Sequence, residues 1–280
     1  MDAKTIDPVY LKKISSHYRS QGMYYAIKSL NYERCAELPY ILKKLEPRFK
    51  EKLNYLDIGS GGESPLPTFL LKNTNWNIYC IDKFDWVNKQ IDFAKKNVPE
   101  DVIRERLHII KQDFLVEEFN DLKFDVITNV SVIEHFDGTT DSTAMNKSAR
   151  LLKAGGTYIL TTLFNEGHFK EFYVNNNVYG VEYKDAGVFY QRHYDSKSIS
   201  DRLIVPSGLK EKERIYFGDY GFRFFERFLQ LPKLLKPLKV LYSWAVPFFA
   251  KKYITYNNKP ISYADMKINT SSGIILTLTN

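Results

Sequence analysis

The sequence predicts a doubly wound α/β fold with a mostly parallel sheet, and three observations support that prediction. Short apolar runs alternate with helical stretches between residues 53 and 163, which is the pattern of parallel strands joined by crossover helices. A glycine-rich turn at 59–62 follows the first of these runs. Later runs lead into Asp82 and Asp113, at the sheet edge where such folds bind their ligands.

Composition limits the class of protein without naming it. The chain has 280 residues, of which 44% are hydrophobic, so a sizeable core is available. The two cysteines give no disulfide framework, and the first segment is unlike a signal peptide, so we expect a cytoplasmic protein. The net charge of +7 fits a nucleic acid, an anionic membrane or an acidic substrate, and charge alone does not choose among them.

Residues 8–46 form a predicted helical segment before the sheet. Leu11, Ile14 and Tyr18 recur at helical spacing among lysines and arginines. We assign residues 1–50 to an N-terminal helical cap. It either covers the ligand cleft or is a packing extension, and the pattern does not separate these two interpretations.

The sheet region contains five predicted strands in chain order. They lie at 53–58, 77–82, 107–110, 124–130 and 157–162. Predicted helices lie at 65–72, 87–96 and 143–152. Gly155 follows the last of these helices and is predicted to be its C-cap. Two later segments, 215–217 and 273–279, are further strand candidates.

The turn after the first strand has the composition of a nucleotide-binding loop. Gly59 and Gly61 allow positive φ and close approach of a ligand, and a helix that begins after Ser64 directs free N–H groups toward it. The G-x-G-x-x-G pattern of dinucleotide sites is missing, which disfavours an NAD-dependent dehydrogenase. Asp57 and Glu63 beside the turn favour a cationic ligand. A purely structural glycine turn is the alternative.

Asp57-x-Gly59-x-Gly61 resembles the first motif of class I S-adenosylmethionine-dependent methyltransferases, although Glu63 stands where that motif has its third glycine. The resemblance covers residues 53–163. It implies a Rossmann-like sheet of seven strands closed by an antiparallel hairpin. The patterns of the flanking segments add an N-terminal helical cap and a helical insertion before the last strand. The resemblance also implies S-adenosyl-L-methionine as the cofactor.

The same resemblance implies which residues bind that cofactor. Asp82, at the end of the second strand, can accept hydrogen bonds from both ribose hydroxyls. Asp113, at the end of the third, would accept from the adenine amine, with Phe114 against the ring. The implied cofactor-binding residues are Asp57, Gly59, Gly61, Asp82, Asp113, Phe114 and Asn129.

Two histidines are candidate catalytic bases. His135 follows the fourth strand, where the resemblance places it near the reactive methyl group. A histidine with a near-neutral pKa can take the proton of an acceptor hydroxyl, but a structural role at a helix start is equally open. His168, just past the fifth strand, is the second candidate. No His, Cys and Asp grouping has metal-ligand spacing, so we expect no metal.

The segment 188–195 is the candidate acceptor site. It resembles an aromatic-x-Arg-x-Tyr segment of bacterial methyltransferases from glycan and secondary-metabolite clusters. Arg192 can clamp a phosphate or carboxylate, or it forms a surface ion pair instead. The predicted acceptor-binding residues are Tyr190, Arg192, His193 and Tyr194.

Residues 219–268 differ in composition from the rest, with phenylalanines and leucines among lysines and arginines. The apolar run 240–250 is about half the length of a membrane span. A basic, aromatic segment can lie in the interface of an anionic bilayer, so a lid, a homodimer surface and peripheral contact with the inner membrane face all stay open. Nucleic acid is disfavoured because the basic residues are interleaved with aliphatic ones.

The predicted organisation is therefore a methyltransferase core at 51–218 and 269–280 with an insertion at 219–268. The predicted function is S-adenosylmethionine-dependent O-methylation of a small-molecule or carbohydrate-like acceptor. Two alternatives remain: a lipid-linked or protein acceptor, and a non-catalytic, methyltransferase-like binding subunit.

Overall fold

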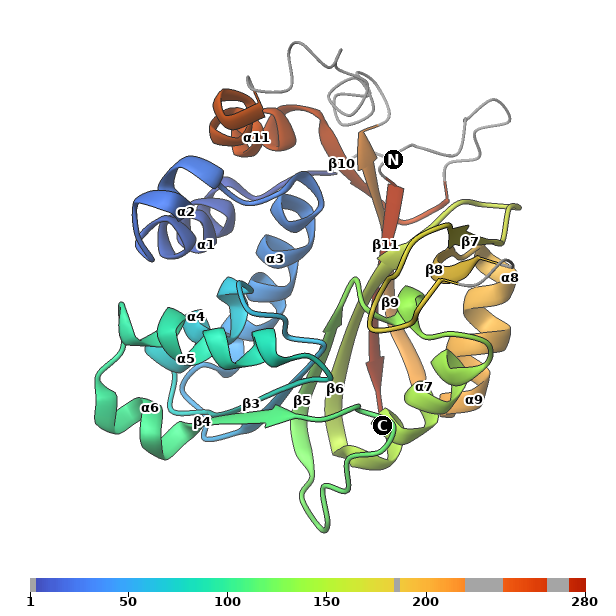
Figure 1. Cartoon of the computed structure of the whole chain (residues 1–280), viewed down its shortest axis with the longest axis horizontal. Helices are drawn as coiled ribbons and strands as arrows, with labels where there is room; N and C mark the ends of the chain where they lie inside the picture. Colours follow the sequence, from blue (N-terminus) through green and yellow to red (C-terminus); the bar gives the residue numbers. More distant parts are fainter. Residues whose placement is uncertain (1–3, 184–186, 220–238, 261–271) are drawn as a thin grey trace.

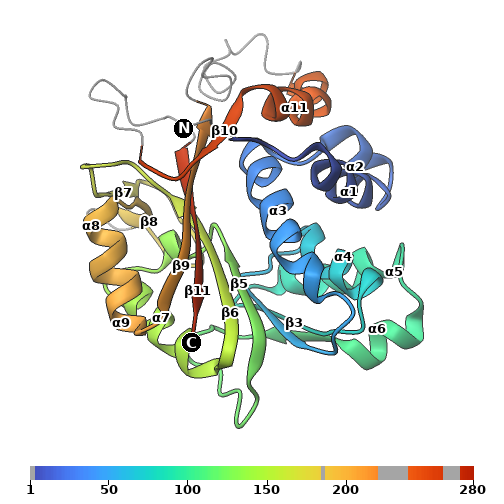
Figure 2. The same cartoon turned by 180° about the vertical axis from the view of Figure 1, so that it is seen from behind.

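A computed structural model describes residues 4–183, 187–219, 239–260 and 272–280. These residues form a nine-stranded sheet with helices on both faces (Figures 1 and 2) and a separate two-stranded hairpin. Residues 220–238 and 261–268 of the predicted insertion lie outside the described residues. No helix among the described residues is long and apolar enough to cross a membrane.

The order of strands in the sheet is β1-β10-β9-β11-β6-β5-β2-β3-β4. The strands are β1 (Lys4–Thr5), β2 (Asn54–Ile58), β3 (Asn77–Asp82), β4 (Leu107–Lys111), β5 (Phe124–Val130), β6 (Leu152–Leu163), β9 (Lys210–Asp219), β10 (Ile254–Asn257) and β11 (Ser272–Thr279). Neighbours from β4 to β6 pair in parallel, and β11 is antiparallel to both β6 and β9. The predicted mostly parallel, seven-stranded fold is therefore confirmed by the strands that lie side by side in the order β4, β3, β2, β5, β6, β11 and β9. Strands β10 and β1 extend the sheet beyond β9.

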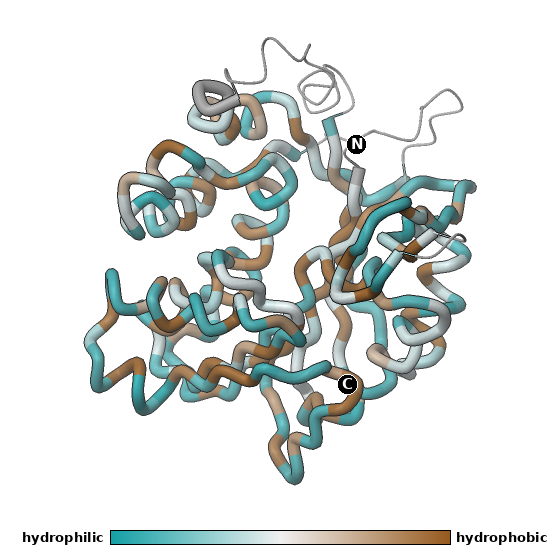
Figure 3. The backbone as a smooth tube through the Cα atoms, viewed as in Figure 1, coloured by the Kyte–Doolittle hydropathy of each residue, from teal (hydrophilic) through white to brown (hydrophobic). Residues whose placement is uncertain are grey.

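The central strands are buried on both faces, which explains why their sequences are nearly continuous apolar runs. Tyr55 and Val126 contribute to the core on one face of the sheet, whereas Leu56 and Ile127 contribute to the core on the other. In Figure 3 these strands form the brown centre of the molecule. The two-residue alternation of side chains places each apolar residue in one of two cores.

Two groups of helices lie on opposite sides of the sheet (Figure 1). The first group is α1 (Pro8–Arg19), α2 (Met23–Lys28), α3 (Tyr32–Leu45), α4 (Pro65–Asn73), α5 (Lys89–Lys95) and α6 (Glu100–Arg106). The second is α7 (Thr140–Leu151) with the continuous helical stretch α8 (Ser196–Ser198), a π-helical turn (Ile199–Ile204) and α9 (Val205–Ser207). A further helix, α11 (Lys239–Tyr253), contacts α2 and α3.

The ends of two helices test the local sequence predictions. Ser64 is the N-cap of α4, and Pro65 is its first residue, as predicted from the turn. The prediction that Gly155 caps a helix is wrong. Helix α7 ends at Leu151, and Gly155, with φ of 72°, lies inside β6. The register of β6 against β5 shifts there, so the glycine forms a bulge in the strand.

The hairpin of β7 (Lys170–Val174) and β8 (Val188–His193) was not predicted from the sequence. It follows β6 and carries the predicted acceptor segment. An isolated bridge between Phe164 and Tyr194 joins the chain after β8 to the end of β6. The hairpin therefore stands beside the carboxyl ends of the parallel strands, where residues that meet a ligand are expected.

Candidate functional site

The glycine turn after β2 is held in a conformation that needs its glycines. Gly59 and Gly61 have φ values of 69° and 58°, in the region that residues with a Cβ rarely adopt. A Cβ on Gly59 would lie 2.5 Å from a methyl group of Val132. The Gly59 amide donates to the Ile81 carbonyl over 2.8 Å. The turn therefore packs directly against the ends of β3 and β5.

Asp82 is oriented by the same turn. One carboxylate oxygen accepts from the Gly61 amide over 3.0 Å, and the other accepts from the Phe84 amide over 3.0 Å. Each carboxylate oxygen has a second lone pair, so both oxygens can still accept hydrogen bonds from a ligand. The structure thus brings Asp82 and Gly61 together, and the ribose role of Asp82 stays a prediction.

Asp57 is a buried carboxyl beside the turn. It accepts a 2.6 Å hydrogen bond from the Thr128 hydroxyl, and burial raises its pKa to about 6. The Thr128 hydroxyl is also 2.5 Å from the Tyr55 hydroxyl. Because its pKa is about 6, the Asp57 carboxyl loses its proton between about pH 5 and pH 7.

A cavity of about 390 Å³ opens beside this turn. Asp57, Gly59 and Gly61 line one side, and residues between α2 and α3 line the other. Ser243 and Val246 of α11 complete part of the wall. The N-terminal helices therefore contribute directly to the pocket, although the division of the chain at residue 50 remains a prediction.

Arg34 is a cavity residue that sequence reasoning missed. Its guanidinium pairs with the buried Glu37 and donates to the Val130 carbonyl over 3.1 Å. Glu37 also accepts from the hydroxyls of Ser131 and Thr161, over 2.6 and 2.8 Å. A guanidinium has five N–H donors, so Arg34 keeps donors for an anion in the cavity. The available signal was a pair of opposite charges three residues apart in a helix that is mostly buried.

Of the three other predicted cofactor residues, two are buried. Asp113 follows β4 and accepts from the Leu115 amide over 2.8 Å. Phe114 is buried and packs against Phe119. Asn129 is fully buried, and its side-chain oxygen Oδ1 accepts from the Ile133 backbone amide over 3.0 Å. Asp113 stays accessible, whereas Phe114 and Asn129 serve the core and the turn after β5 in this structure.

His135 lies in an aromatic cluster between the turn after β5 and the hairpin. Its ring is 5.0 Å from that of Tyr179 and 5.7 Å from that of Tyr190, measured between centroids. Tyr179 stacks parallel to Tyr190 at 6.0 Å and lies 6.2 Å from Phe84. Phe84 is two residues past Asp82, so the cluster adjoins the turn. Tyr179 was not predicted, and its φ of 54° is unusual for a bulky residue.

The hydrogen bonds of His135 determine its tautomer. Nδ1 lies 2.7 Å from the Tyr190 carbonyl oxygen and 3.2 Å from the Tyr179 hydroxyl. A carbonyl only accepts, so Nδ1 carries the proton and Nε2 keeps its lone pair. Burial lowers the pKa of His135 below its usual value near 6.5. The imidazole is therefore neutral at pH 7.

The other two predicted histidines lie in different surroundings. His168 is exposed in the loop between β6 and β7. His193 is half-buried at the end of β8, where its ring lies 4.6 Å from that of Phe172. Burial lowers the pKa of His193 to about 4. Within the described ranges, no three His, Cys, Asp or Glu side chains group closely enough to hold a metal ion.

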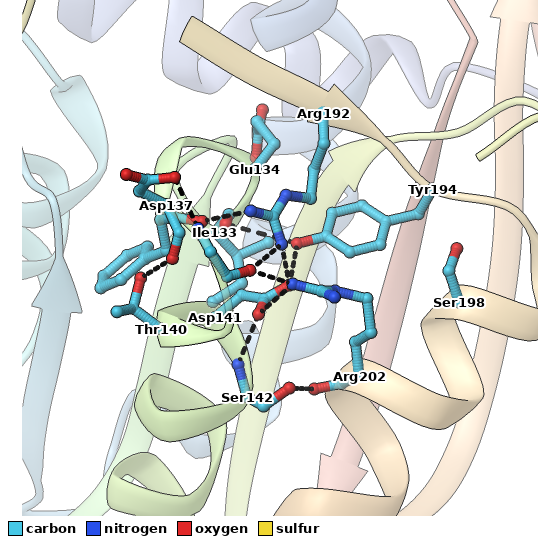
Figure 4. A network of polar contacts seen from close by, with 12 residues as sticks. Ile133, Glu134, Asp137, Thr140, Asp141, Ser142, Arg192, Tyr194, Ser198 and Arg202 are labelled. Carbon is cyan, nitrogen blue, oxygen red and sulfur yellow. Dashed lines mark hydrogen bonds and ion pairs between the residues drawn. The ribbon is translucent and has the colours of Figure 1, made fainter. Parts of the chain in front are cut away.

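Arg192 and Tyr194 belong to a buried network rather than to the cavity (Figure 4). The Arg192 guanidinium donates to Asp141 over 2.7 Å and to the Phe136 carbonyl over 2.8 Å. The Tyr194 hydroxyl donates to Asp141 over 2.9 Å, and Arg202 binds both oxygens of the same carboxylate. With these partners, neither side chain faces an acceptor, so the structure gives no support to the predicted clamp. The network ties β8 and the π-helical turn to the start of α7.

Comparisons with known proteins bear on this site. Residues 56–160 match the family described as a methyltransferase domain. That match includes the glycine turn, Asp82, Asp113 and His135. A search of curated protein sequences gives no match.

Several solved structures share the fold at low sequence identity. Coclaurine N-methyltransferase bound to N-methylheliamine and SAH is 10% identical, with a TM-score of 0.54 over 99% of this chain and 82% of that one. An S-adenosylmethionine-dependent methyltransferase from Clostridium acetobutylicum is 13% identical, with a TM-score of 0.50 over 89% and 92%. The cyclase SpnF is 16% identical, with a TM-score of 0.51 over 88% and 82%. The fold alone therefore does not specify the acceptor or the reaction.

Proposed function

We propose that this chain, an S-adenosylmethionine-dependent methyltransferase of class I fold, methylates a hydroxyl oxygen of a small-molecule acceptor with His135 as the base. The observation that carries the proposal is the fixed tautomer of His135. The proton on Nδ1 is held by the Tyr190 carbonyl, and Nε2 is the basic nitrogen. An oxygen nucleophile needs such a base, because a hydroxyl is a poor nucleophile while it keeps its proton.

The residues that line the cavity, together with the carboxylates at the adjoining strand ends, fit the cofactor by their chemistry. When bound, S-adenosylmethionine supplies an electrophilic methyl group on a positively charged sulfur. Asp82 presents two oriented acceptor oxygens suited to ribose hydroxyls. Arg34 suits the carboxylate of the methionine part, and Asp57 suits a cationic group. Asp113 and the glycine turn complete the proposed cofactor site.

His135 is the stronger of the two candidate bases. It lies beside the turn and the aromatic cluster, whereas His168 is exposed on a loop. Glu134 is not a rival at neutral pH, because burial raises its pKa to about 8 and the carboxyl is then protonated. Proton transfer from the acceptor hydroxyl to Nε2 leaves an imidazolium that returns its proton to solvent after the reaction.

The aromatic cluster supports a ring-shaped acceptor. Tyr179, Tyr190 and Phe84 present aromatic rings, and the Lys83 ammonium lies 5.0 Å from the Phe84 ring centroid and 5.8 Å from that of Tyr179. Aromatic faces bind the apolar faces of sugar and planar rings. We therefore retain a carbohydrate-like or secondary-metabolite acceptor.

Formation of S-adenosylhomocysteine tests the proposal. The protein is incubated with S-adenosylmethionine, with and without a small-molecule extract of its host, and the product is measured over time. We expect formation to depend on the extract. If the rate is the same without extract, and if the cofactor still binds, the chain uses the fold for binding or for another reaction.

Asp82→Ala should weaken binding of S-adenosylmethionine by about 1.5–3 kcal/mol, the value of hydrogen bonds to a charged group. Calorimetric titration measures the change, and Asp82→Asn is the matched variant because it keeps the shape and one acceptor oxygen. Its loss should be smaller. An unchanged dissociation constant in folded Asp82→Ala protein would remove Asp82 from the ribose role.

Binding of S-adenosylmethionine should strengthen as the pH rises from about 5 to 7. Only the ionised Asp57 attracts a cation, and its pKa is raised to about 6, so the attractive form is gained across that range. Titrations at several pH values measure the effect. Asp57→Asn should flatten the profile. A flat profile for the wild-type protein would show that Asp57 does not face a cationic group of the cofactor.

A further inference from the structure

Two neighbouring helices present large apolar side chains to solvent. On α2, Met23 is 81% exposed, Tyr24 60% and Ile27 45%; on α11, Trp244 is 63% exposed and Phe248 65%. We call these five residues the α2–α11 face. The two helices contact each other and lie side by side in both views (Figures 1 and 2).

The exposed apolar side chains of this face are separate from those that pack against the core. Helix α11 already buries Val246 and Ala250 against the protein, so Trp244 and Phe248 are a second apolar side. Helix α2 has no buried residue at all. Grouped exposed apolar residues of this size mark a surface that something covers.

The charges on the two helices indicate which kind of surface can cover the α2–α11 face. Neither α2 nor α11 contains an acidic residue. Lys251 and Lys252, at the end of α11, are exposed, and no carboxylate among the described residues pairs with them. A second copy packed by two-fold symmetry would present the same two helices, which offer no carboxylate to pair with these lysines. A surface that is both apolar and anionic fits better.

We propose that the α2–α11 face docks on an anionic membrane surface. Tyr24 and Trp244 are the residue types that anchor at the boundary of a bilayer, and the lysines add attraction to anionic headgroups. Helix α11 has 15 residues, so it is about 22 Å long, shorter than the roughly 30 Å of bilayer hydrocarbon. The helix would lie in the interface with Trp244 and Phe248 among the lipids.

Docking would bring the cofactor cavity to the membrane. Ser243 and Val246 of α11, together with Lys28 at the end of α2, line that cavity. An acceptor held in the lipid would then enter beside the docked helices. This consequence for the acceptor rests on the proposed function, whereas docking itself does not.

Flotation of the intact protein with vesicles tests docking without any turnover. We expect binding to equimolar phosphatidylcholine and phosphatidylglycerol at low ionic strength, weaker binding at high ionic strength, and little binding to phosphatidylcholine alone. Absence of binding to the anionic vesicles at low ionic strength would overturn the proposal.

Paired variants show whether this face is responsible. Trp244→Ala with Phe248→Ala should weaken vesicle binding about tenfold or more. Lys251→Glu with Lys252→Glu should weaken it by about 25-fold or more, at a factor of about five for each lysine removed. Lys95→Glu with Lys96→Glu makes the same change of net charge at exposed positions near α5 and should have a much smaller effect.

Equal losses in the two lysine pairs would reduce the binding to overall charge and contradict the proposal. A second result would also contradict the proposal: the wild-type protein is a dimer that does not bind vesicles, and the variant Trp244→Ala with Phe248→Ala is a monomer. A second copy of the chain would then cover the face. Circular dichroism confirms that each variant is folded. A fully folded variant with lost vesicle binding and intact cofactor affinity supports docking even if no acceptor is methylated.

Discussion

Replacing His135 by alanine is expected to lower the turnover number by about 10²–10⁴-fold, the usual contribution of a positioned base. Affinity for S-adenosylmethionine should be nearly unchanged, because the proposed cofactor contacts come from Asp57, Asp82 and Arg34. Steady-state kinetics and calorimetric titration of the same preparation measure the two effects. A loss confined to cofactor affinity would instead give His135 a structural role.

The pH profile separates a base from a positioning residue. The neutral imidazole is the active form, so the turnover number should rise with pH as His135 loses its proton. The midpoint should lie below about 6.5, because burial lowers the pKa of this group. His135→Ala should lose that dependence. If His168→Ala has the larger effect on turnover, His168 is the base.

Replacing Arg192 by alanine should reduce the free energy of unfolding by about 3–5 kcal/mol, the cost of breaking a buried ion pair. Arg192 and Asp141 are both fully buried. Removal of the guanidinium leaves the carbonyl of Phe136 without its donor and takes from Asp141 one of the two guanidinium groups that neutralise it. Urea unfolding measures the loss. Turnover should also fall, because Arg192 holds the segment directly after His135.

Arg202→Ala is the matched control for this network. Arg202 binds the same carboxylate but is partly exposed, and Asp141 would keep its bond to Arg192, so the loss of stability should be smaller. The account of Arg192 would be contradicted if Arg192→Ala kept its stability and only raised the KM for the acceptor. That result would restore the acceptor clamp suggested by the sequence.

The sequence predicted the sheet and its ligand-binding edge because both depend on local patterns. Nearly continuous apolar runs define β2, β3 and β5, and the glycines near Asp57 need little tertiary context. Asp82 was predictable for the same reason, since a carboxylate that ends a strand must lie at the carboxyl edge of the sheet.

The missed or altered residues depend on contacts between distant segments. The sequence around Arg192 suggested a side chain that binds an anion. Its guanidinium instead pairs with Asp141, 51 positions away in the chain, inside a buried network. Tyr179 lies in the connection between two strands that the pattern did not reveal. Arg34 reaches the cavity because α3 packs over the sheet. The helix-cap prediction for Gly155 was wrong for a simpler reason, because a glycine after a helix also suits a bulge at the start of a strand.

The most direct test of the account is the position of the transferred methyl group. The protein is incubated with S-adenosylmethionine that carries carbon-13 in its methyl group and with the host extract, and the purified product is studied by nuclear magnetic resonance. The account predicts a labelled methyl group bonded to oxygen, formed together with S-adenosylhomocysteine. A label bonded to nitrogen, carbon or sulfur would contradict it.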